Sequence, residues 1–210
     1  MNPEESQLAT QMRAGDRNAL AALFSAHRER LRKIVRFRLD PRLAGRLADS
    51  DVLQETYIAA ATRLEHFEKQ PEMPAFLWLR LILGQQLTDL HRRHFQAEKR
   101  DIRKEVRVSA RDAQFGDLSQ HTSLAIASKL ADKMTAVSEV VSRAEQFDRM
   151  EQVLNDMDAT DREVIALRHF EELSNSETAK VLELETSAAS KRYLRAMAKL
   201  TALMNVEPRS

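Results

Sequence analysis

The sequence predicts an all-α protein in which two helical domains are joined by a linker. Only four Gly and five Pro occur among 210 residues, while Ala, Leu, Glu and Arg dominate the composition. Apolar residues recur at the three- and four-residue spacing of amphipathic helices along most of the chain. This pattern fades over residues 109–122, where large apolar side chains are few, so we place the linker there.

The first domain, residues 1–106, is predicted to consist of helices separated by short breaks. Gly15 interrupts the helical pattern, and Pro41 ends the helix that follows. Asp49 or Ser50 is suited to cap the next helix. A loop with two prolines then precedes the longest helix. The expected helices cover residues 4–14, 18–39, 49–67 and 75–106, with the loop over 70–74.

Between the domains lies a connecting segment, residues 107–145. Its first part is the polar linker, and its second part, residues 124–144, has helical spacing with only modest apolar content. We expect this second part to form a connecting helix, or a segment that a partner orders. The second domain follows over residues 146–205 and is predicted to contain four helices.

Capping residues mark two helix starts in the second domain. Thr160 and Glu163 are three residues apart, which is the spacing of a capping box, and they predict a helix that begins just after Thr160. Ser174 and Glu177 repeat this spacing and predict a helix start at Ser174. Thr186 is the predicted N-cap of the last helix, since its hydroxyl can accept a backbone N–H.

The last two helices have the pattern of a helix-turn-helix. Residues 186–200 contain four Lys or Arg and no acid, and at 100° per residue the apolar and cationic side chains separate onto opposite sides. The apolar side holds Ala189, Tyr193, Ala196, Met197, Leu200 and Met204; the other side holds Ser187, Ala188, Lys191, Arg195 and Ala198, flanked by Arg192 and Lys199. Such a helix fits a DNA groove. A surface helix with a solvated basic face is the alternative, which the capping box and the small Ala179 disfavour.

The long helix of the first domain carries a second candidate surface. One stripe within an arc of roughly 80° begins apolar, turns polar and ends cationic. Its members are Trp78, Ile82, Gln85, Asp89, Arg92, Gln96 and Arg103, and further cations nearby are Arg93, Lys99, Arg100 and Lys104. A basic surface with aromatic rings such as Phe95 suits unpaired bases. Trp78 taken alone is better explained as a core residue.

Composition excludes several classes of protein. The absence of Cys excludes disulfides and thiolate metal sites. No apolar run approaches 18 residues, so we expect a soluble intracellular protein without membrane insertion. The net charge of +1 conceals blocks of opposite sign, such as eight bases against two acids over residues 27–46 and six acids against two bases over residues 47–74. Alternating blocks suit contacts with both an acidic polymer and a protein partner.

Taken in order, these motifs resemble the sigma-70 family of RNA polymerase sigma factors, specifically the short extracytoplasmic-function (ECF) type that keeps only regions 2 and 4. In the first domain the resemblance covers Gly15-Asp16, the acidic segment 51–57, and Phe76, Leu77, Trp78, Leu79, Ile82, Asp89 and Arg92. In the second domain it covers Arg162, Val164, Leu167, Ser174, Glu177, Ala179, Leu182, Arg192, Arg195, Ala196 and Leu200. It extends over nearly all of the chain except the linker.

The resemblance implies binding to core RNA polymerase, through its β′ clamp and β flap, and to promoter DNA in the cytoplasm. It implies neither catalysis nor a cofactor or metal, and it allows an anti-sigma protein as a further partner. The implied polymerase-binding residues are Asp51, Gln54 and Glu55; those for the −10 element are Gln85, Arg92, Arg93, Lys99 and Arg100; those for the −35 element are Ser187, Lys191, Arg192 and Arg195.

The sequence departs from the family pattern at a few positions. Glu183 stands at a corner that often has Gly, Ala188 and Ala189 replace the usual Thr and Val, and Gln85 replaces Asn. We expect Gln85 to alter the preference for the −10 sequence without loss of function, whereas the sequence does not determine the −35 preference that Glu183, Ala188 and Ala189 give.

Two other functions are alternatives to the sigma-factor interpretation. A helix-turn-helix regulator that binds operator DNA without polymerase would share the second domain, but it leaves the Asp51–Glu55 segment unexplained. A helical enzyme could use a metal at Asp89, His91 and His94, although the adjacent arginines would repel a cation. Asp51 and Glu55 could also form a metal site or an acid/base pair, but no His or further carboxylate stands at ligand spacing.

Overall fold

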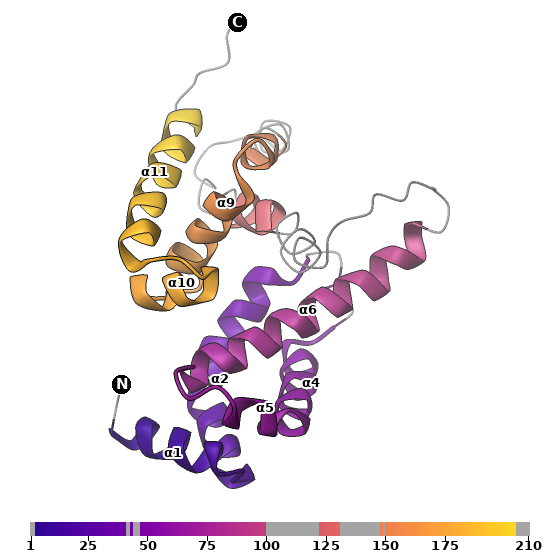
Figure 1. Ribbon diagram of the computed structural model, residues 1–210. Helices are drawn as coiled ribbons and strands as arrows, with labels where there is room; N and C mark the ends of the chain where they lie inside the picture. Colours follow the sequence, from indigo (N-terminus) through magenta and orange to yellow (C-terminus); the bar gives the residue numbers. More distant parts are fainter. Residues whose placement is uncertain are drawn as a thin grey trace, which may run out of the picture. The chain divides into compact units, whose positions relative to one another are not determined.

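The computed structural model describes residues 3–40, 43, 47–99, 122–130, 148 and 150–204. Within these ranges all regular structure is helical and no strand occurs, so the all-α prediction is confirmed (Figure 1). The chain divides into two compact units, Met1–Glu105 and Val106–Ser210. The predicted linker, the end of the long helix beyond residue 99 and most of the connecting helix lie outside the described residues, so these parts stay predictions.

The first unit is built from five described helices. Their bounds are α1 Pro3–Arg13, α2 Arg17–Arg38, α4 Asp49–Thr62, α5 Leu64–Glu68 and α6 Ala75–Lys99. The break between α1 and α2 lies where the sequence predicts it. Gly15 adopts φ +84°, which glycine tolerates best. Asp16 then caps α2, because its Oδ1 accepts from the N–H groups of Asn18 (2.7 Å) and Ala19 (3.3 Å).

The helix predicted over residues 49–67 differs from the prediction at two points. Its N-cap is Ala48, without a side-chain hydrogen bond, so capping by Asp49 or Ser50 was wrong. Asp49 lies instead in the first turn, where its negative charge interacts favourably with the helix dipole. Its Oδ2 pairs with Arg36 Nε at 2.5 Å. The helix also breaks at Arg63, whose φ of −108° and ψ of 15° are not helical, and α5 follows as a separate turn.

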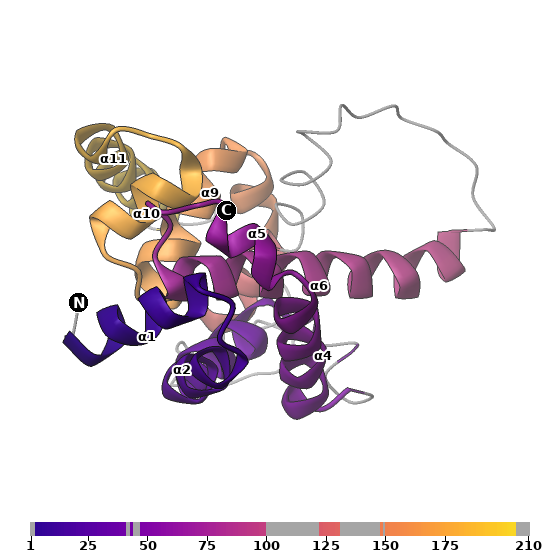
Figure 2. The same cartoon turned by 60° about the horizontal axis from the view of Figure 1, so that its bottom comes forward.

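The core of the first unit lies among α2, α4 and α6, and α1 packs against α2 and α5. Trp78 is 3% exposed and its ring lies 5.0 Å from that of Phe67, so its predicted core position is confirmed. Phe24 and Tyr57 meet edge to face at 5.2 Å between α2 and α4. Figure 2 shows the C-terminal end of α6 continuing past α4.

The second unit contains helical residues 122–130 and 150–155 and four labelled elements. These are α9 Ala159–Ile165, the π-helix η1 Ala166–Phe170, α10 Asn175–Leu182 and α11 Thr186–Met204. Helix α11 packs against α9 and α10. The contacts are close because Ala179, Ala189 and Ala196 are buried there and have small side chains. No helix in the described ranges combines the length and apolarity needed to span a bilayer.

Of the two capping boxes predicted for this unit, one is confirmed and the other was wrong. Ser174 caps α10 in a complete capping box with Glu177, as predicted. The box of Thr160 and Glu163 was wrong. Asp158 is the N-cap of α9, since a carboxylate two residues upstream competes for the same N–H groups, and Glu163 instead accepts from Thr122 Oγ1 at 3.1 Å. The last helix begins one residue earlier than expected, because Thr186 is already its first residue.

Candidate functional site

An exposed face of α4 carries the three residues that the sequence predicts for polymerase binding. Asp51, Gln54 and Glu55 are exposed, while Val52 and Leu53 between them are buried against the core. The alternation follows from helical spacing, which places residues three and four apart on one side. Asp51 and Glu55 have no ion-pair partner among the described residues, so their charges face solvent.

The same face contains an apolar residue that sequence reasoning missed. Ile58 is 49% exposed and follows Asp51 by seven residues, Gln54 by four and Glu55 by three. Helical spacing could have identified it, but an isolated apolar residue beside buried ones is usually assigned to the core. We call Asp51, Gln54, Glu55 and Ile58 the α4 face. It combines two carboxylates, an amide and an apolar side chain.

The stripe along α6 emerges from the core as the sequence predicts up to Arg92, and the side chains of Gln96 and Arg103 lie outside the described residues. Trp78 and Ile82 are buried, Gln85 is half-buried, and Asp89 and Arg92 are exposed. The adjacent Arg93 is exposed as well, and its Nε donates to the backbone carbonyl of Asp89 at 3.3 Å. The side chain of Lys99 and the whole of Arg100 lie outside the described residues, so their assignment to the −10 element stays a prediction.

Gln85 is held by a residue that the sequence did not single out. Arg63, at the break between α4 and α5, donates from Nη1 to Gln85 Oε1. Sequence reasoning had no signal for this contact, because it expected a continuous helix through Arg63. We call Arg63, Leu81 and Gln85 the amide subsite, since Leu81 lies one turn before Gln85 on α6 and is 40% exposed.

The histidine considered as a metal ligand has a structural role. His91 is 1% exposed, and its Nε2 accepts from the backbone N–H of Asp40 at 3.4 Å. That contact uses the nitrogen lone pair that a metal would need. The side chain of His94 lies outside the described residues. No cluster of three potential metal-binding side chains occurs in the described part of the chain.

Helices α10 and α11 form the predicted helix-turn-helix. Ser174 Oγ accepts from the N–H of Glu177 at 3.2 Å, and Glu177 Oε2 accepts from the N–H of Ser174 at 2.7 Å. At the corner, Glu183 adopts the left-handed conformation with φ 53°, which explains why glycine suits this position. Asn175 Nδ2 donates to the carbonyl of Thr186 at 2.7 Å and so connects the starts of the two helices.

The two sides of α11 are occupied as predicted. Ala189, Ala196 and Leu200 are buried, whereas Ser187, Ala188, Lys191, Arg195 and Ala198 are exposed. One apolar residue on the exposed side was missed: Leu194 is 65% exposed. It lies beside Ser187 and Ala198 on the helical projection. The exposed side therefore combines cations with short polar and apolar side chains, a set that can contact phosphates and base edges.

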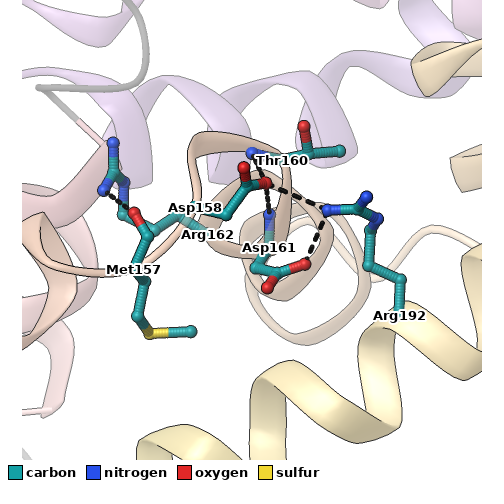
Figure 3. Close-up of polar contacts among 6 residues, drawn as sticks. All are labelled: Met157, Asp158, Thr160, Asp161, Arg162 and Arg192. Carbon is teal, nitrogen blue, oxygen red and sulfur yellow. Dashed lines mark hydrogen bonds and ion pairs between the residues drawn. The ribbon is translucent and has the colours of Figure 1, made fainter.

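Arg192 differs from the other predicted −35 residues, because acids of its own unit hold its charge. Its Nη1 lies 3.0 Å from Asp158 Oδ1 and 2.8 Å from Asp161 Oδ1. Figure 3 shows the guanidinium reaching from α11 to both carboxylates at the start of α9. Lys191 and Arg195 have no comparable ion pair among the described residues. The Arg192 contact attaches α11 to the N-terminus of α9.

Asp158 is the centre of this network. Its Oδ1 accepts from the N–H groups of Thr160 (2.9 Å) and Asp161 (3.3 Å) as well as from Arg192. Partial burial acts to raise the pKa of Asp158, but the two backbone donors and the Arg192 charge together outweigh it and hold the pKa below the ordinary value of 3.8. The carboxylate is thus ionised at neutral pH.

A buried arginine orders the turn that leads into this network. Arg162 Nη1 donates to the backbone carbonyls of Leu154 (2.7 Å), Asn155 (3.1 Å) and Met157 (2.5 Å). Burial lowers the pKa of the Arg162 guanidinium, while the charges of Asp158 and Glu163 act to raise it. Because Arg162 binds the carbonyls just before Asp158, it fixes the position of the N-cap and, through Arg192, the position of α11.

Comparison with known proteins gives consistent results along the whole chain. A family model described as ECF sigma factor matches residues 2–206. The chain is 29% identical over 209 residues to the RNA polymerase sigma factor CnrH of Cupriavidus metallidurans. This match covers 99% of this chain and 98% of CnrH. It is 30% identical over 158 residues to the RNA polymerase sigma factor NccH of Alcaligenes xylosoxydans xylosoxydans, covering 73% and 72% respectively.

A solved structure agrees with these sequence matches. The structure of CnrH in complex with the cytosolic domain of CnrY is similar to this chain with a TM-score of 0.53 and 26% sequence identity. The match covers 96% of this chain and 97% of that chain.

Proposed function

Because the chain belongs to the ECF sigma factor family, we propose that it binds core RNA polymerase and directs transcription initiation at specific promoters. The resemblance seen in the sequence is confirmed by the family match and by the two named sigma factors. The family acts in transcription rather than as enzymes, and the residues proposed below act by binding. The polymerase supplies the catalyst, so we propose that the chain works with it in the cytoplasm.

The observation that carries this proposal is the surface of α11. A capping box at Ser174 starts the first helix of the helix-turn-helix, and the second helix exposes Lys191 and Arg195 together with Ser187. We propose that these three residues contact the −35 element as duplex DNA, the cations on phosphates and Ser187 near base edges. In this proposal Arg192 holds α11 in place through Asp158 and Asp161, and contributes less to the DNA contact than its neighbours.

We propose that the α4 face binds the β′ clamp. Asp51 and Glu55 lie one turn apart and are exposed without ion-pair partners in the described part of the chain, so both can meet a basic partner surface together. Ile58 adds apolar area beside them, and apolar burial flanked by charge is common at protein interfaces. The β flap remains an expected second contact for the other unit.

We propose that the exposed part of α6 binds the separated non-template strand of the −10 element. Gln85 faces the base, Arg92 and Arg93 contact the backbone, and Lys99 and Arg100 extend the cationic surface. Capture of an unstacked base offsets the cost of opening the duplex, which is a few kcal/mol per base. Because α6 begins in the core with Trp78, the captured base would be held by a rigid element.

A protein inhibitor is a further proposed partner. CnrH was solved with the cytosolic domain of CnrY bound to it. We propose that a cytosolic segment of another protein can bind this chain in a similar way and compete with polymerase.

The decisive test is co-purification with bacterial core RNA polymerase, followed by run-off transcription from a promoter library randomised at the −35 and −10 positions. We expect a stable complex and transcripts from a defined subset of promoters. Specific binding of duplex DNA by the protein alone, without binding to polymerase, would instead establish an operator-binding regulator.

A further inference from the structure

We propose that Gln85 reads an unpaired base as a hydrogen-bond donor only, and that the amide subsite therefore selects bases with a keto oxygen over adenine. This inference rests on the proposed function, because it specifies the base chemistry at the −10 surface of α6. Its starting point is the contact between Arg63 Nη1 and Gln85 Oε1. The contact joins the break between α4 and α5 to the middle of α6.

The contact determines which atoms of the Gln85 amide remain available. The oxygen and nitrogen of an amide are nearly indistinguishable by shape, but a guanidinium has only donors, so the atom that faces Arg63 must be the oxygen. A second donor approaching that oxygen would also meet the positive charge of Arg63. No described residue accepts from the Gln85 amide nitrogen, so its two N–H groups are available to a ligand.

The surroundings of the amide suit the face and edge of a base. Leu81, one turn before Gln85, is 40% exposed, and an apolar side chain can lie against the face of an unstacked base. Gln85 is only half-buried, so its amide can meet the edge of the same base. Asp89 lies one turn on the other side of Gln85, about 6 Å further along the helix axis, and so away from a base resting on Leu81.

The position of Arg63 is fixed by its own backbone. Its N–H donates to the carbonyl of Ala60 at 3.1 Å, and its carbonyl accepts from the N–H of His66 at 2.9 Å. The break between α4 and α5 is therefore hydrogen-bonded on both sides. A guanidinium on such a fixed segment holds the amide of Gln85 in one orientation before any base arrives.

The available donors discriminate among the four bases. A glutamine amide reads adenine by using its oxygen and nitrogen together on N6 and N7, and the contact with Arg63 removes that option. Guanine, thymine and cytosine each present a carbonyl oxygen that the N–H groups can reach. Adenine has no carbonyl, and on its Watson–Crick and Hoogsteen edges the ring nitrogens stand beside the N6 amino group, where donor would face donor.

The test is run-off transcription by the full-length protein with core polymerase, from the library randomised at the −10 positions. Gln85→Glu replaces the N–H donors by an acceptor and keeps a partner for Arg63. Arg63→Met releases the amide oxygen. Gln86→Glu is the matched control, since Gln86 is also half-buried and carries the same change of charge, but points about 100° away. Co-purification with polymerase checks the folding of each variant.

For the natural protein we expect adenine to be disfavoured at one −10 position by about threefold to tenfold, the size of one neutral hydrogen bond. Gln85→Glu should abolish the keto preference at that position, Arg63→Met should make adenine acceptable there, and Gln86→Glu should leave the preference unchanged. Equal use of adenine at every −10 position, or the same base profile in Gln85→Glu as in the natural protein, would overturn the inference alone. Absence of transcripts from every template would overturn the proposed function as well.

Discussion

Removal of the Asp158 carboxylate should loosen the start of α9 and the attachment of α11 together. Asp158→Ala deletes the acceptor for the N–H groups of Thr160 and Asp161 and one of the two carboxylates that hold Arg192. Loss of an N-cap costs about 0.5–2 kcal/mol. The ion pair adds less than about 1 kcal/mol, since the Asp158 side chain is 60% exposed and therefore screened. We expect a loss of roughly 1–2 kcal/mol.

Hydrogen exchange measured by mass spectrometry is the suitable assay, because it separates the two units of one chain. A loss of 1–2 kcal/mol corresponds to about 5–30-fold faster exchange in peptides from α9 and α11. Peptides from α4 in the first unit should exchange at the natural rate and serve as an internal reference. Asp156→Ala is the matched control, since Asp156 is exposed nearby and has no described side-chain contact.

Two further variants separate the cap from the ion pair. Asp158→Asn keeps a capping acceptor and loses the charge, whereas Arg192→Met keeps the cap and loses the partner, so each should accelerate exchange only a few-fold. The pKa of Asp158 is lower in the folded state than its ordinary value, so its charge stabilises the fold above that value. This contribution is lost as the pH falls through the folded pKa. Equal exchange in Asp158→Ala and Asp156→Ala at neutral pH would refute the assigned network.

The remaining predictions concern binding and the corner of the helix-turn-helix. Asp51→Arg with Glu55→Arg should weaken polymerase binding in pull-down titrations, because both exposed charges would then repel a basic partner. Lys191→Ala with Arg195→Ala should weaken duplex binding and reduce the slope of log K against log salt by about two, since each phosphate contact contributes about 0.9. Glu183→Gly should raise the free energy of unfolding by roughly 0.5–1 kcal/mol in thermal denaturation, as relief of the left-handed strain exceeds the entropy cost of glycine.

A specific experimental result would contradict each of these three predictions. Unchanged polymerase affinity in the double arginine variant would remove the α4 face from the interface. An unchanged salt slope after loss of Lys191 and Arg195 would mean that α11 does not contact phosphates. A lower unfolding temperature for Glu183→Gly would mean that the glutamate makes contacts worth more than the strain.

Most helices could be predicted from the sequence, because apolar spacing and breaks at Gly15 and Pro41 are local signals. The two-sided pattern of α11 was predictable for the same reason. The start of α9 was not, since Asp158 and Thr160 both suit an N-cap and the sequence alone does not say which reaches the N–H groups. Asp158 is the N-cap, and its carboxylate also pairs with Arg192, which lies 34 residues further along the chain.

The misses in the candidate site share a physical cause. The contact of Arg63 with Gln85 spans 22 residues, and it depends on a helix break that apolar spacing does not reveal. Exposure of Ile58 and Leu194 depends on where neighbouring helices end, which is a property of packing. Arg192 shows the converse, because helical projection placed it beside Lys191 and Arg195, while acids from another helix hold its charge.

The position of Trp78 gives this chain a built-in optical probe. It is the only tryptophan among 210 residues, and it is buried against Phe67 in the first unit. Its emission therefore reports the first unit alone, while the two tyrosines, Tyr57 and Tyr193, lie one in each unit. Tryptophan fluorescence excited at the red edge of the absorption band follows the unfolding of the first unit, which contains the α4 face and α6. Far-ultraviolet circular dichroism follows the unfolding of both units. Any difference between the two melting curves would measure how independently the units unfold.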